Sequence, residues 1–298
     1  CVVPAGLATP VEHRIVHPTV GPALDAAVER CGSALERASA SLVDRARRAV
    51  GEAAQARARG FQPECLTLFL NDSCNLMCRY CHALPADGSA QAISLEAIRS
   101  AGEMVAAACA RRGLVFTCVF HGGGEPTLDR SRADAALDVL GAVARNQGVR
   151  LWTYIATNAV MPEERARWVA ARFDLVGLSC DGPPDVQERQ RPSRDGLPTS
   201  PRVERTARIL RDAGRPFHAR ATITQDTIER QPEIAAYLME SLTPVEARLE
   251  PIYDSAASAG LGPAAAPRFV EGFLKARRVA ADMGVAVTTS LVRPDVLH

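Results

Sequence analysis

The chain has 298 residues, of which 47% are hydrophobic and 23% charged, and its formal net charge is +1. These values are typical of a globular protein and argue against a general binder of polyanions such as nucleic acid. The sequence has no run of about eighteen apolar residues, so no membrane span is expected. Nine cysteines in a chain of this length do not suggest a small secreted disulfide scaffold.

The two ends of the chain suggest a piece of a longer protein. The chain begins with Cys1 rather than Met and ends abruptly at residues 293–298. Its first residues do not resemble a secretory signal, because they lack a charged start and a sustained apolar core. Residues 1–20 show no periodicity and are expected to form a loose arm. Over residues 21–60, apolar residues recur at helical spacing, which predicts a helical extension with a solvated basic face. A surface that docks a partner or a leader peptide is the alternative for this extension.

From residue 61 onward, short apolar segments alternate with longer amphipathic ones. Ser94 and Gly113 are placed to cap the two ends of one helix, and Pro162 suits the first turn of another. Strands are expected at residues 65–71, 114–121, 151–157, 175–179, 218–224 and 247–252. Helices are expected at residues 94–112, 129–147, 162–173, 200–214, 232–242 and 267–283, followed by an apolar segment at 285–292.

Strands that alternate with helices imply right-handed βαβ units and a parallel sheet. Six such units predict an α/β fold, a partial (β/α)6 TIM-like barrel that follows the N-terminal helical extension. Two parts are therefore expected, an arm and extension over residues 1–60 and a barrel domain over residues 61–298.

Three cysteines lie close together in the segment Cys74-Asn-Leu-Met-Cys78-Arg-Tyr-Cys81. Such a loop can cap three corners of a [4Fe–4S] cluster. Because these clusters normally have four cysteine ligands, the fourth iron would stay open to a non-protein ligand. Structural zinc is an alternative, but zinc needs four ligands and the only further donor nearby is His82. A redox pair of Cys78 and Cys81 would leave Cys74 without a role.

The spacing C-x3-C-x-Φ-C, in which Φ is aromatic, resembles the signature of the radical SAM enzymes. Cys74, Cys78, Tyr80 and Cys81 match it in full. The resemblance implies that the three cysteines hold a [4Fe–4S] cluster and that S-adenosylmethionine (SAM) binds the open iron. It also implies that SAM is cleaved to methionine and a 5′-deoxyadenosyl radical, which removes a hydrogen atom from the substrate. In such enzymes the cofactors supply the chemistry, and the protein supplies orientation.

Several distinctive segments directly follow predicted strands, where βα barrels gather their functional groups. The run Gly122-Gly-Gly-Glu-Pro126 follows the second strand, and its glycines allow a close approach of backbone to ligand. It resembles the GGE motif of the family, so Gly123, Gly124 and Glu125 are expected to position the SAM amino group. As an alternative, Glu125 could be an acid at the start of a helix.

The segment Ser179-Cys-Asp181-Gly-Pro follows the fourth strand. It resembles the S-x-D-G-P segment of the branch that includes anaerobic sulfatase-maturating enzymes and SPASM-type peptide modifiers. The resemblance implies that Ser179, and secondly Asp181, contacts the SAM ribose. It also implies that Arg191 binds the SAM carboxylate, which suits a planar guanidinium. Arg189 and Arg194 are alternatives for this last role.

The sequence departs from the branch pattern in three places. Thr157-Asn-Ala159 replaces a frequent Thr-Asn-Gly, and Gln187-Glu188 replaces a usual His-Asp. No cysteine follows Cys180, whereas SPASM and twitch domains place auxiliary-cluster cysteines after the barrel. We therefore expect either a chain that stops before such a domain or a relative with one cluster.

The remaining candidates rest on position alone. Tyr253 and Asp254 follow the sixth strand together with Glu250, where a substrate acid, base or radical relay could lie. His121 precedes the glycine run and is placed to face the pocket. The other cysteines in the barrel region are expected to be packing residues, namely Cys65, Cys109, Cys118 and Cys180.

The sequence thus predicts a radical SAM enzyme that abstracts hydrogen from a peptide or protein substrate, as in the maturation of sulfatases or of ribosomally made peptides. The family implies a flavodoxin- or ferredoxin-type electron donor. An oxygen-sensitive cluster favours the reducing cytoplasm, and neither a membrane nor a nucleic-acid partner is expected. Two alternatives stay open, radical modification of a small biosynthetic intermediate and a non-catalytic Fe–S or zinc-binding module.

Overall fold

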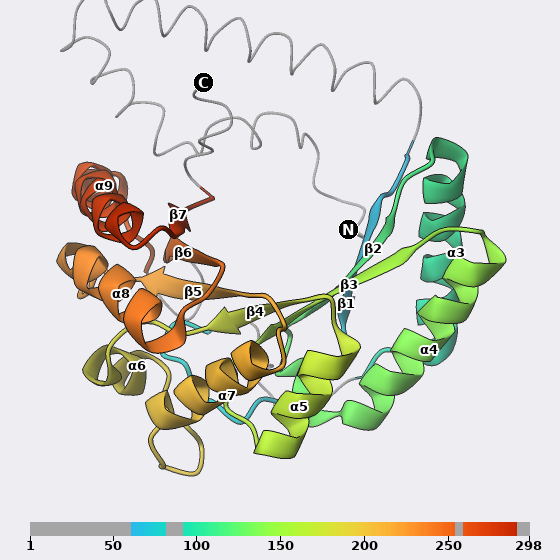
Figure 1. Ribbon diagram of the computed structural model, residues 1–298, viewed down its shortest axis with the longest axis horizontal. Helices are drawn as coiled ribbons and strands as arrows, with labels where there is room; N and C mark the ends of the chain where they lie inside the picture. The colour runs from blue at the N-terminus through green and yellow to red at the C-terminus, as the bar shows by residue number, and fades with distance from the viewer. Residues whose placement is uncertain (1–60, 82–91, 254–258, 291–298) are drawn as a thin grey trace, which may run out of the picture.

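The computed structural model describes residues 61–81, 92–253 and 259–290, which form one curved parallel sheet with helices on its outer side (Figure 1). The strands lie side by side in chain order. They are β1 (Cys65–Phe69), β2 (Phe116–His121), β3 (Leu151–Thr157), β4 (Leu175–Ser179), β5 (Phe217–Ile223), β6 (Glu246–Pro251) and β7 (Ala286–Thr288). Because β1 and β7 are the two edges of the sheet, the barrel is open. The predicted α/β fold and partial barrel are confirmed.

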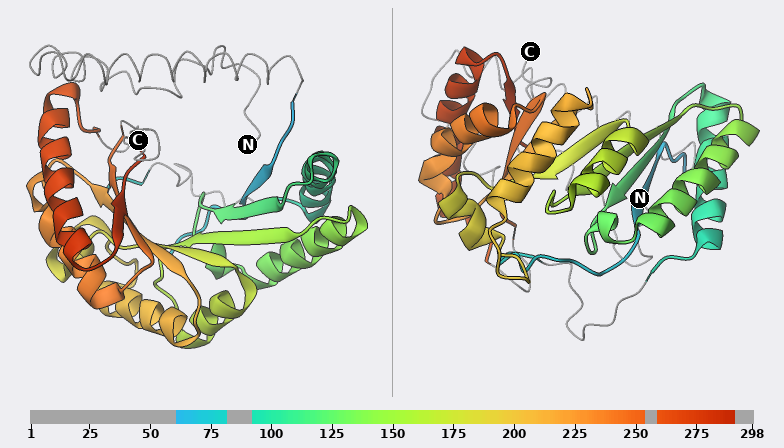
Figure 2. Two further views of the ribbon diagram at one scale, coloured as in Figure 1. Left: turned by 45° about the horizontal axis from the view of Figure 1, so that its top comes forward. Right: turned by 60° about the horizontal axis from the view of Figure 1, so that its bottom comes forward.

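The helices cover the convex face of the sheet and leave the concave face to the interior of the open barrel (Figure 2). Each lies between consecutive strands, so every crossover is a βαβ unit. They are α3 (Leu95–Arg112), α4 (Arg130–Asn146), α5 (Glu163–Arg172), α6 (Pro184–Gln190), α7 (Ser200–Asp212), α8 (Gln231–Tyr237) and α9 (Ala266–Asp282).

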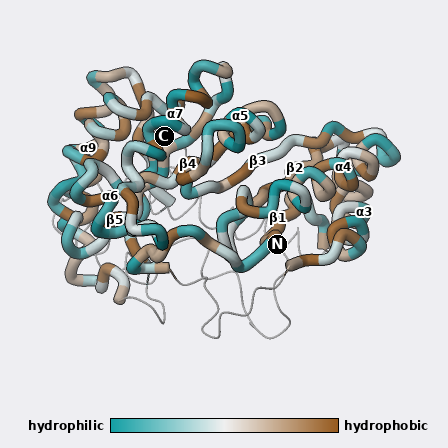
Figure 3. Tube along the Cα trace, turned by 90° about the horizontal axis from the view of Figure 1, so that it is seen from below, coloured by the Kyte–Doolittle hydropathy of each residue, from teal (hydrophilic) through white to brown (hydrophobic). Residues whose placement is uncertain are grey.

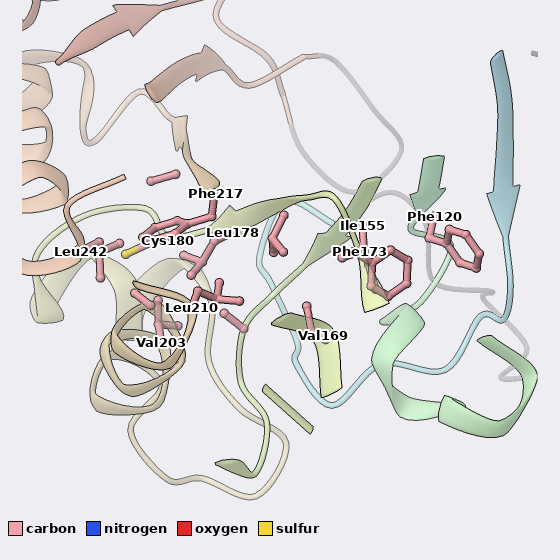
Figure 4. Packing of buried hydrophobic residues seen from close by; sticks show 14 of the residues in the cluster. Phe120, Ile155, Val169, Phe173, Leu178, Cys180, Val203, Leu210, Phe217 and Leu242 are labelled. Carbon is pink, nitrogen blue, oxygen red and sulfur yellow. The ribbon is translucent and has the colours of Figure 1, made fainter. Parts of the chain in front are cut away.

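The hydrophobic core lies between the convex face and these helices. Along β2, Phe116 and Phe120 are buried under the helices, and the residues that alternate with them are partly exposed. The ring of Phe120 meets that of Phe173 edge to face, with 5.1 Å between centroids. Figure 4 shows this pair and, further along the sheet, Val203 and Leu210 of α7 among the buried side chains. This packing fixes the strands whose ends carry the site.

The predicted helix boundaries agree with the structure where clear caps were present. Ser94 accepts a hydrogen bond from the Ala97 N–H (3.1 Å) at the start of α3, and Gly113 ends this helix with a φ of 63°. Among the α-helices and strands, two were not predicted. Helix α6 is short and begins at the second of two consecutive prolines, and β7 has only three residues within its apolar segment, so neither shows a full hydrophobic period.

Some predictions fall on residues outside the described ranges. These are the arm and helical extension over residues 1–60, His82 as a further zinc donor, and Asp254. Figure 3 shows hydrophilic and hydrophobic residues interspersed along the described helices. None of these helices is both long and apolar enough to span a membrane.

Candidate active site

A pocket of about 470 Å³ opens at the carboxyl ends of the strands. It is lined by residues from β2 to β6 and from the loops that follow β1 to β4 and β6. Most residues singled out from the sequence meet there: Cys74, Cys78, Cys81, His121, Gly123, Gly124, Glu125, Ser179, Arg191, Glu250 and Tyr253. Asp181 does not line the pocket.

The cysteine loop is held by the backbone that follows α6. The Met77 N–H donates to the Pro192 carbonyl (2.8 Å), and Arg194 donates from its Nε to the Cys74 carbonyl (2.9 Å). Arg194 therefore supports the loop from outside the pocket, and Arg189 is exposed on α6. Of the three arginines considered for the SAM carboxylate, only Arg191 lines the pocket.

The thiols of Cys74, Cys78 and Cys81 are half-buried and form no disulfide. Burial raises the pKa of Cys78 to about 11, although Arg191 opposes this shift, and burial also raises the pKa of Cys74. Among the described residues, no three His, Cys, Asp or Glu side chains are arranged to hold one metal ion. A zinc ion needs its cysteine ligands about 2.3 Å away, whereas each cysteine of a cubane binds a different iron. The two alternatives thus differ in whether the three thiols converge on one metal ion.

The glycine run packs directly against the start of the cysteine loop. The Gly124 N–H donates to the Asn71 carbonyl (2.7 Å), and the Glu125 N–H donates to the Ser73 carbonyl (2.7 Å). A Cβ on Gly124 would lie only 2.0 Å from the Ser73 carbonyl oxygen, so a larger residue would displace the loop. The sequence indicated a close approach to a ligand, and the structure shows that this glycine also lets two backbones approach each other.

Glu125 is only 3% exposed and connects the ends of β2 and β3. Its Oε1 accepts hydrogen bonds from the Thr127 N–H (3.1 Å) and the Thr157 hydroxyl (2.8 Å), and its Oε2 accepts one from the Asn158 N–H (2.7 Å). The first of these bonds caps the short helix Pro126–Leu128. Glu125 thus has the helix-start position foreseen as its alternative role, and it still lines the pocket.

A buried chain of hydrogen bonds joins the aromatic residue of the cysteine motif to the turn after β4. The Tyr80 hydroxyl donates to Asp181 Oδ2 (2.7 Å) and accepts from Arg191 Nη1 (2.6 Å). Asp181 is fully buried and also accepts from Gln190 Nε2 (2.8 Å) and from the Thr222 N–H (3.0 Å). Burial raises the pKa of Tyr80 well above its usual value, so its phenol is protonated. Asp181 therefore positions Tyr80 and Arg191 from behind the pocket wall.

Arg191 has a donor that no described residue uses. Its side chain is 11% exposed, and its buried Nε has no hydrogen-bond partner in the described part of the chain. Leaving a buried donor unpaired costs about 1–3 kcal/mol. A carboxylate supplied by a ligand would satisfy this atom with a charge-assisted hydrogen bond.

Ser179 ends β4 and is half-buried in the pocket wall, in register with Arg220 of β5. Two residues earlier, Gly177 makes room for the ring of Tyr154 from β3. A Cβ at Gly177 would lie 1.7 Å from the Tyr154 hydroxyl oxygen. A glycine inside a strand often marks such a close approach.

The residues at two of the departures from the branch pattern have defined local roles. Gln187 accepts a hydrogen bond from the Asp181 N–H (2.8 Å), and Glu188 accepts from the Ser200 N–H (2.8 Å) at the start of α7. Ala159 keeps the turn after β3 by adopting a φ of 61°, a conformation that glycine adopts more readily.

At the mouth of the pocket, Tyr253 is 44% exposed and its hydroxyl lies 2.9 Å from the Ser290 Oγ. The Ser290 N–H in turn donates to the buried Glu250 carboxylate (3.0 Å). The structure thus places Tyr253, one of the two catalytic candidates, in the pocket, and the other, Asp254, lies outside the described residues.

Several polar residues without a role predicted from the sequence help to form the site. Asn158 donates from its Nδ2 to Asn75 Oδ1 (2.8 Å) and lies 3.8 Å from the Cys74 sulfur, which links β3 to the cysteine loop. Tyr154 and Arg220 line the pocket from the concave face of the sheet. The alternation of polar residues along β5 was the available signal for such a face.

Comparison with known families decides the class of this protein. The model described as the radical SAM superfamily matches residues 69–238, more than half of the chain. The chain belongs to the radical SAM superfamily. It is therefore an enzyme of a family that uses a [4Fe–4S] cluster and SAM, as the sequence predicted.

Curated relatives of this radical SAM enzyme include the cysteine-type anaerobic sulfatase-maturating enzymes of two strains of Clostridium perfringens. Each is 25% identical over 173 residues, which cover 57% of this chain and 46% of the relative. The chain thus spans about half the length of these relatives.

Solved structures of radical SAM proteins share the fold. Native anSMEcpe with bound AdoMet has a TM-score of 0.61 and 22% identity, covering 76% of this chain and 63% of that chain. SuiB from Streptococcus suis bound to S-adenosylmethionine has a TM-score of 0.57 and 15% identity, covering 83% of this chain and 55% of that chain. At these identities the likeness shows the fold alone.

Proposed function

We propose that this radical SAM enzyme cleaves SAM reductively and removes a hydrogen atom from a peptide or protein substrate, in a maturation reaction of the sulfatase or ribosomal-peptide type. The convergence of three cysteines, the glycine run and Arg191 in one pocket supports the cleavage. The likeness to sulfatase-maturating enzymes supports the substrate class, as do structures of anSMEcpe with the Kp18Cys peptide and of SuiB with precursor peptide SuiA.

Cys74, Cys78 and Cys81 would each bind one iron of the cluster. Since thiols must lose their protons to bind metal, and burial raises the pKa of Cys78, assembly of the cluster releases protons. When bound, the reduced cluster would supply one electron to the sulfonium of SAM, and cleavage of a C–S bond would give methionine and the 5′-deoxyadenosyl radical that abstracts hydrogen from the substrate. A flavodoxin- or ferredoxin-type protein would deliver the electron.

The remaining pocket residues would hold SAM in place. Gly123, Gly124 and Glu125 would position its amino group, and Ser179 its ribose. Arg191 would bind its carboxylate through the unpaired Nε. Asp181 would act indirectly, because its carboxylate bonds to Tyr80 and lies 3.9 Å from Arg191 Nη1.

Anaerobic assay of 5′-deoxyadenosine tests the cleavage. The chain is reconstituted with iron and sulfide, reduced with dithionite and given SAM. We expect 5′-deoxyadenosine from the wild type and from Cys65→Ala, a cysteine outside the pocket, and none from Cys78→Ala. A cluster-loaded wild type that forms no 5′-deoxyadenosine, or a Cys78→Ala variant that forms as much, would contradict the proposal.

Deuterium transfer tests the substrate class. A library of fully deuterated peptides is incubated with the reduced enzyme and SAM, and 5′-deoxyadenosine is analysed by mass spectrometry. Deuterium in the 5′-methyl group supports a peptide substrate. Transfer from small deuterated metabolites, but from no peptide, would point to the small-molecule reaction instead.

A further inference from the structure

The concave face of the sheet below the cysteine loop carries two polar side chains without a hydrogen-bond or ion-pair partner among the described residues. We call this region the trough and define it by Tyr154 of β3 and Arg220 of β5. Both line the pocket, and Arg220 is exposed within it. Within residues 61–81, 92–253 and 259–290, neither side chain makes a hydrogen bond or an ion pair.

The acidic groups nearest in the sheet are engaged with other partners. Arg220 is in register with Ser179 on one side and Arg248 on the other. Glu246 pairs with Arg248 (3.0 Å), and Glu250 accepts hydrogen bonds from Ser290. The charge of Arg248 is thereby offset by Glu246, and within the described ranges neither carboxylate forms a hydrogen bond or an ion pair with Arg220.

Tyr154 provides a second donor at a fixed position. Its ring lies over Gly177, where a Cβ would be only 1.7 Å from the hydroxyl oxygen. Burial raises the pKa of Tyr154, although Arg248 and Arg220 oppose this shift, so its hydroxyl is protonated and can donate a hydrogen bond. Glu246 adds to the shift, so both arginines and this glutamate act on the hydroxyl.

The trough is deeper in the barrel than the expected SAM carboxylate site. Arg220 precedes Thr222 by two residues on the same face of β5, which is a step of about 7 Å along a strand. The Thr222 N–H bonds to Asp181, and Asp181 lies beside Arg191. Arg191 has its own unpaired Nε at that level, which leaves Arg220 for another group.

We propose that Arg220 and Tyr154 form a subsite that binds a carboxylate of the substrate, such as an acidic side chain next to the residue that loses hydrogen. This proposal rests on the proposed function, in which SAM occupies the upper part of the pocket. A guanidinium and a phenol that both donate to one carboxylate form charge-assisted hydrogen bonds, which are about twice as strong as neutral ones. An amide in place of the carboxylate loses that advantage.

Calorimetry with two matched probes tests the subsite. Acetylated and amidated Gly-Gly-Glu-Gly-Gly and Gly-Gly-Gln-Gly-Gly are titrated anaerobically into cluster-loaded protein saturated with SAM. We expect the wild type to bind the Glu peptide about tenfold more tightly than the Gln peptide, and Arg220→Gln to lose this preference. Tyr154→Phe should reduce it about threefold. Arg277→Gln, at an exposed arginine of α9, should retain it.

Three results would overturn the proposal. One is equal affinity for the two peptides, which includes no measurable binding of either at millimolar concentration. Another is a preference for the Glu peptide that stays unchanged in both Arg220→Gln and Tyr154→Phe. If Arg220→Gln does not fold, Tyr154→Phe alone provides this test. The third is a Kd for SAM that rises about tenfold in Arg220→Gln with the peptide preference intact, which would assign Arg220 to SAM. Failure of the proposed function shows separately, as a wild type that forms no 5′-deoxyadenosine.

Discussion

The rim of the pocket and the trough below it use polar side chains in opposite ways. We define the rim as Glu125 and Asn158, which line the pocket at the carboxyl ends of the strands, together with Asp181 and Gln190, which lie behind its wall. Each of these side chains is buried and forms a hydrogen bond with another loop or strand. In the trough, Arg220 makes no such bond within the described ranges. Rim residues therefore hold the loops in place, and trough residues are left to meet a ligand.

The largest expected effect lies in the rim. Asp181→Asn removes the charge beside the buried Arg191 and should lower the free energy of unfolding by about 3 kcal/mol. The midpoint of urea denaturation of the metal-free chain measures this. Asp138→Asn is the control, because its side chain is 75% exposed and its ion pair should contribute at most about 0.5 kcal/mol. Equal midpoints for the two variants would contradict the structural role of Asp181.

A smaller effect on the free energy of unfolding is expected for Glu188, whose carboxylate caps the start of α7 behind the rim. Burial disfavours its ionised form, but hydrogen bonds from Ser200 and Thr199 outweigh this and lower the pKa of Glu188. A lowered folded-state pKa means that the carboxylate stabilises the fold above its unfolded pKa of about 4.3 and loses this contribution as the pH falls through the folded value. Glu188→Gln should cost about 1 kcal/mol at pH 7.

Urea denaturation at several pH values tests the direction of this pH dependence. The difference between wild type and Glu188→Gln should shrink as the pH is lowered from 5 toward 3. Glu103→Gln, at an exposed position of α3, should show little difference at any pH. A cost of Glu188→Gln that grows toward low pH would refute the capping account.

The turn after β3 should show a still smaller effect. Ala159→Gly relieves a left-handed alanine that costs about 1–2 kcal/mol. It also loses a buried methyl worth about 0.8 kcal/mol and adds the chain entropy of glycine, about 0.5–1 kcal/mol. The gain and the losses nearly cancel, so stability should change by less than about 0.5 kcal/mol. Ala219→Gly in β5 has no strain to relieve and should cost about 1.5 kcal/mol. Equal losses in thermal or urea denaturation would mean that Ala159 is not strained.

The trough should show the smallest effect on stability. Because Arg220 has no protein partner in the described part of the chain, Arg220→Gln should change the free energy of unfolding by less than about 0.5 kcal/mol or raise it. Denaturation of the metal-free chain measures this. A loss above about 1.5 kcal/mol would show that Arg220 supports the fold and would remove the contrast with the rim.

Much of the fold was predictable because its signals are local. The caps of α3 and the alternation of apolar strands with amphipathic helices are visible in short windows of sequence, and they gave the parallel barrel. The cysteine spacing and the glycine run are local as well, and they indicated the pocket.

The rest depended on contacts between distant segments. The bond between Tyr80 and Asp181 joins residues 101 positions apart, and nothing near Asp181 shows that its carboxylate faces the protein and not the pocket. Likewise, the requirement for glycine at position 177 becomes visible only when the ring of Tyr154, on the neighbouring strand, is seen to lie over it. Side-chain direction and pairing across strands are set by the sheet register, which no single segment encodes.

The central claim is that three cysteines leave one iron of the cluster open and that SAM binds it in this pocket. Electron paramagnetic resonance of the dithionite-reduced, reconstituted chain tests this most directly, with spectra recorded before and after addition of SAM. We predict the signal of a reduced [4Fe–4S] cluster whose g-values shift when SAM is added, and the loss of this signal in Cys78→Ala. A cluster signal that saturating SAM leaves unchanged would contradict the account.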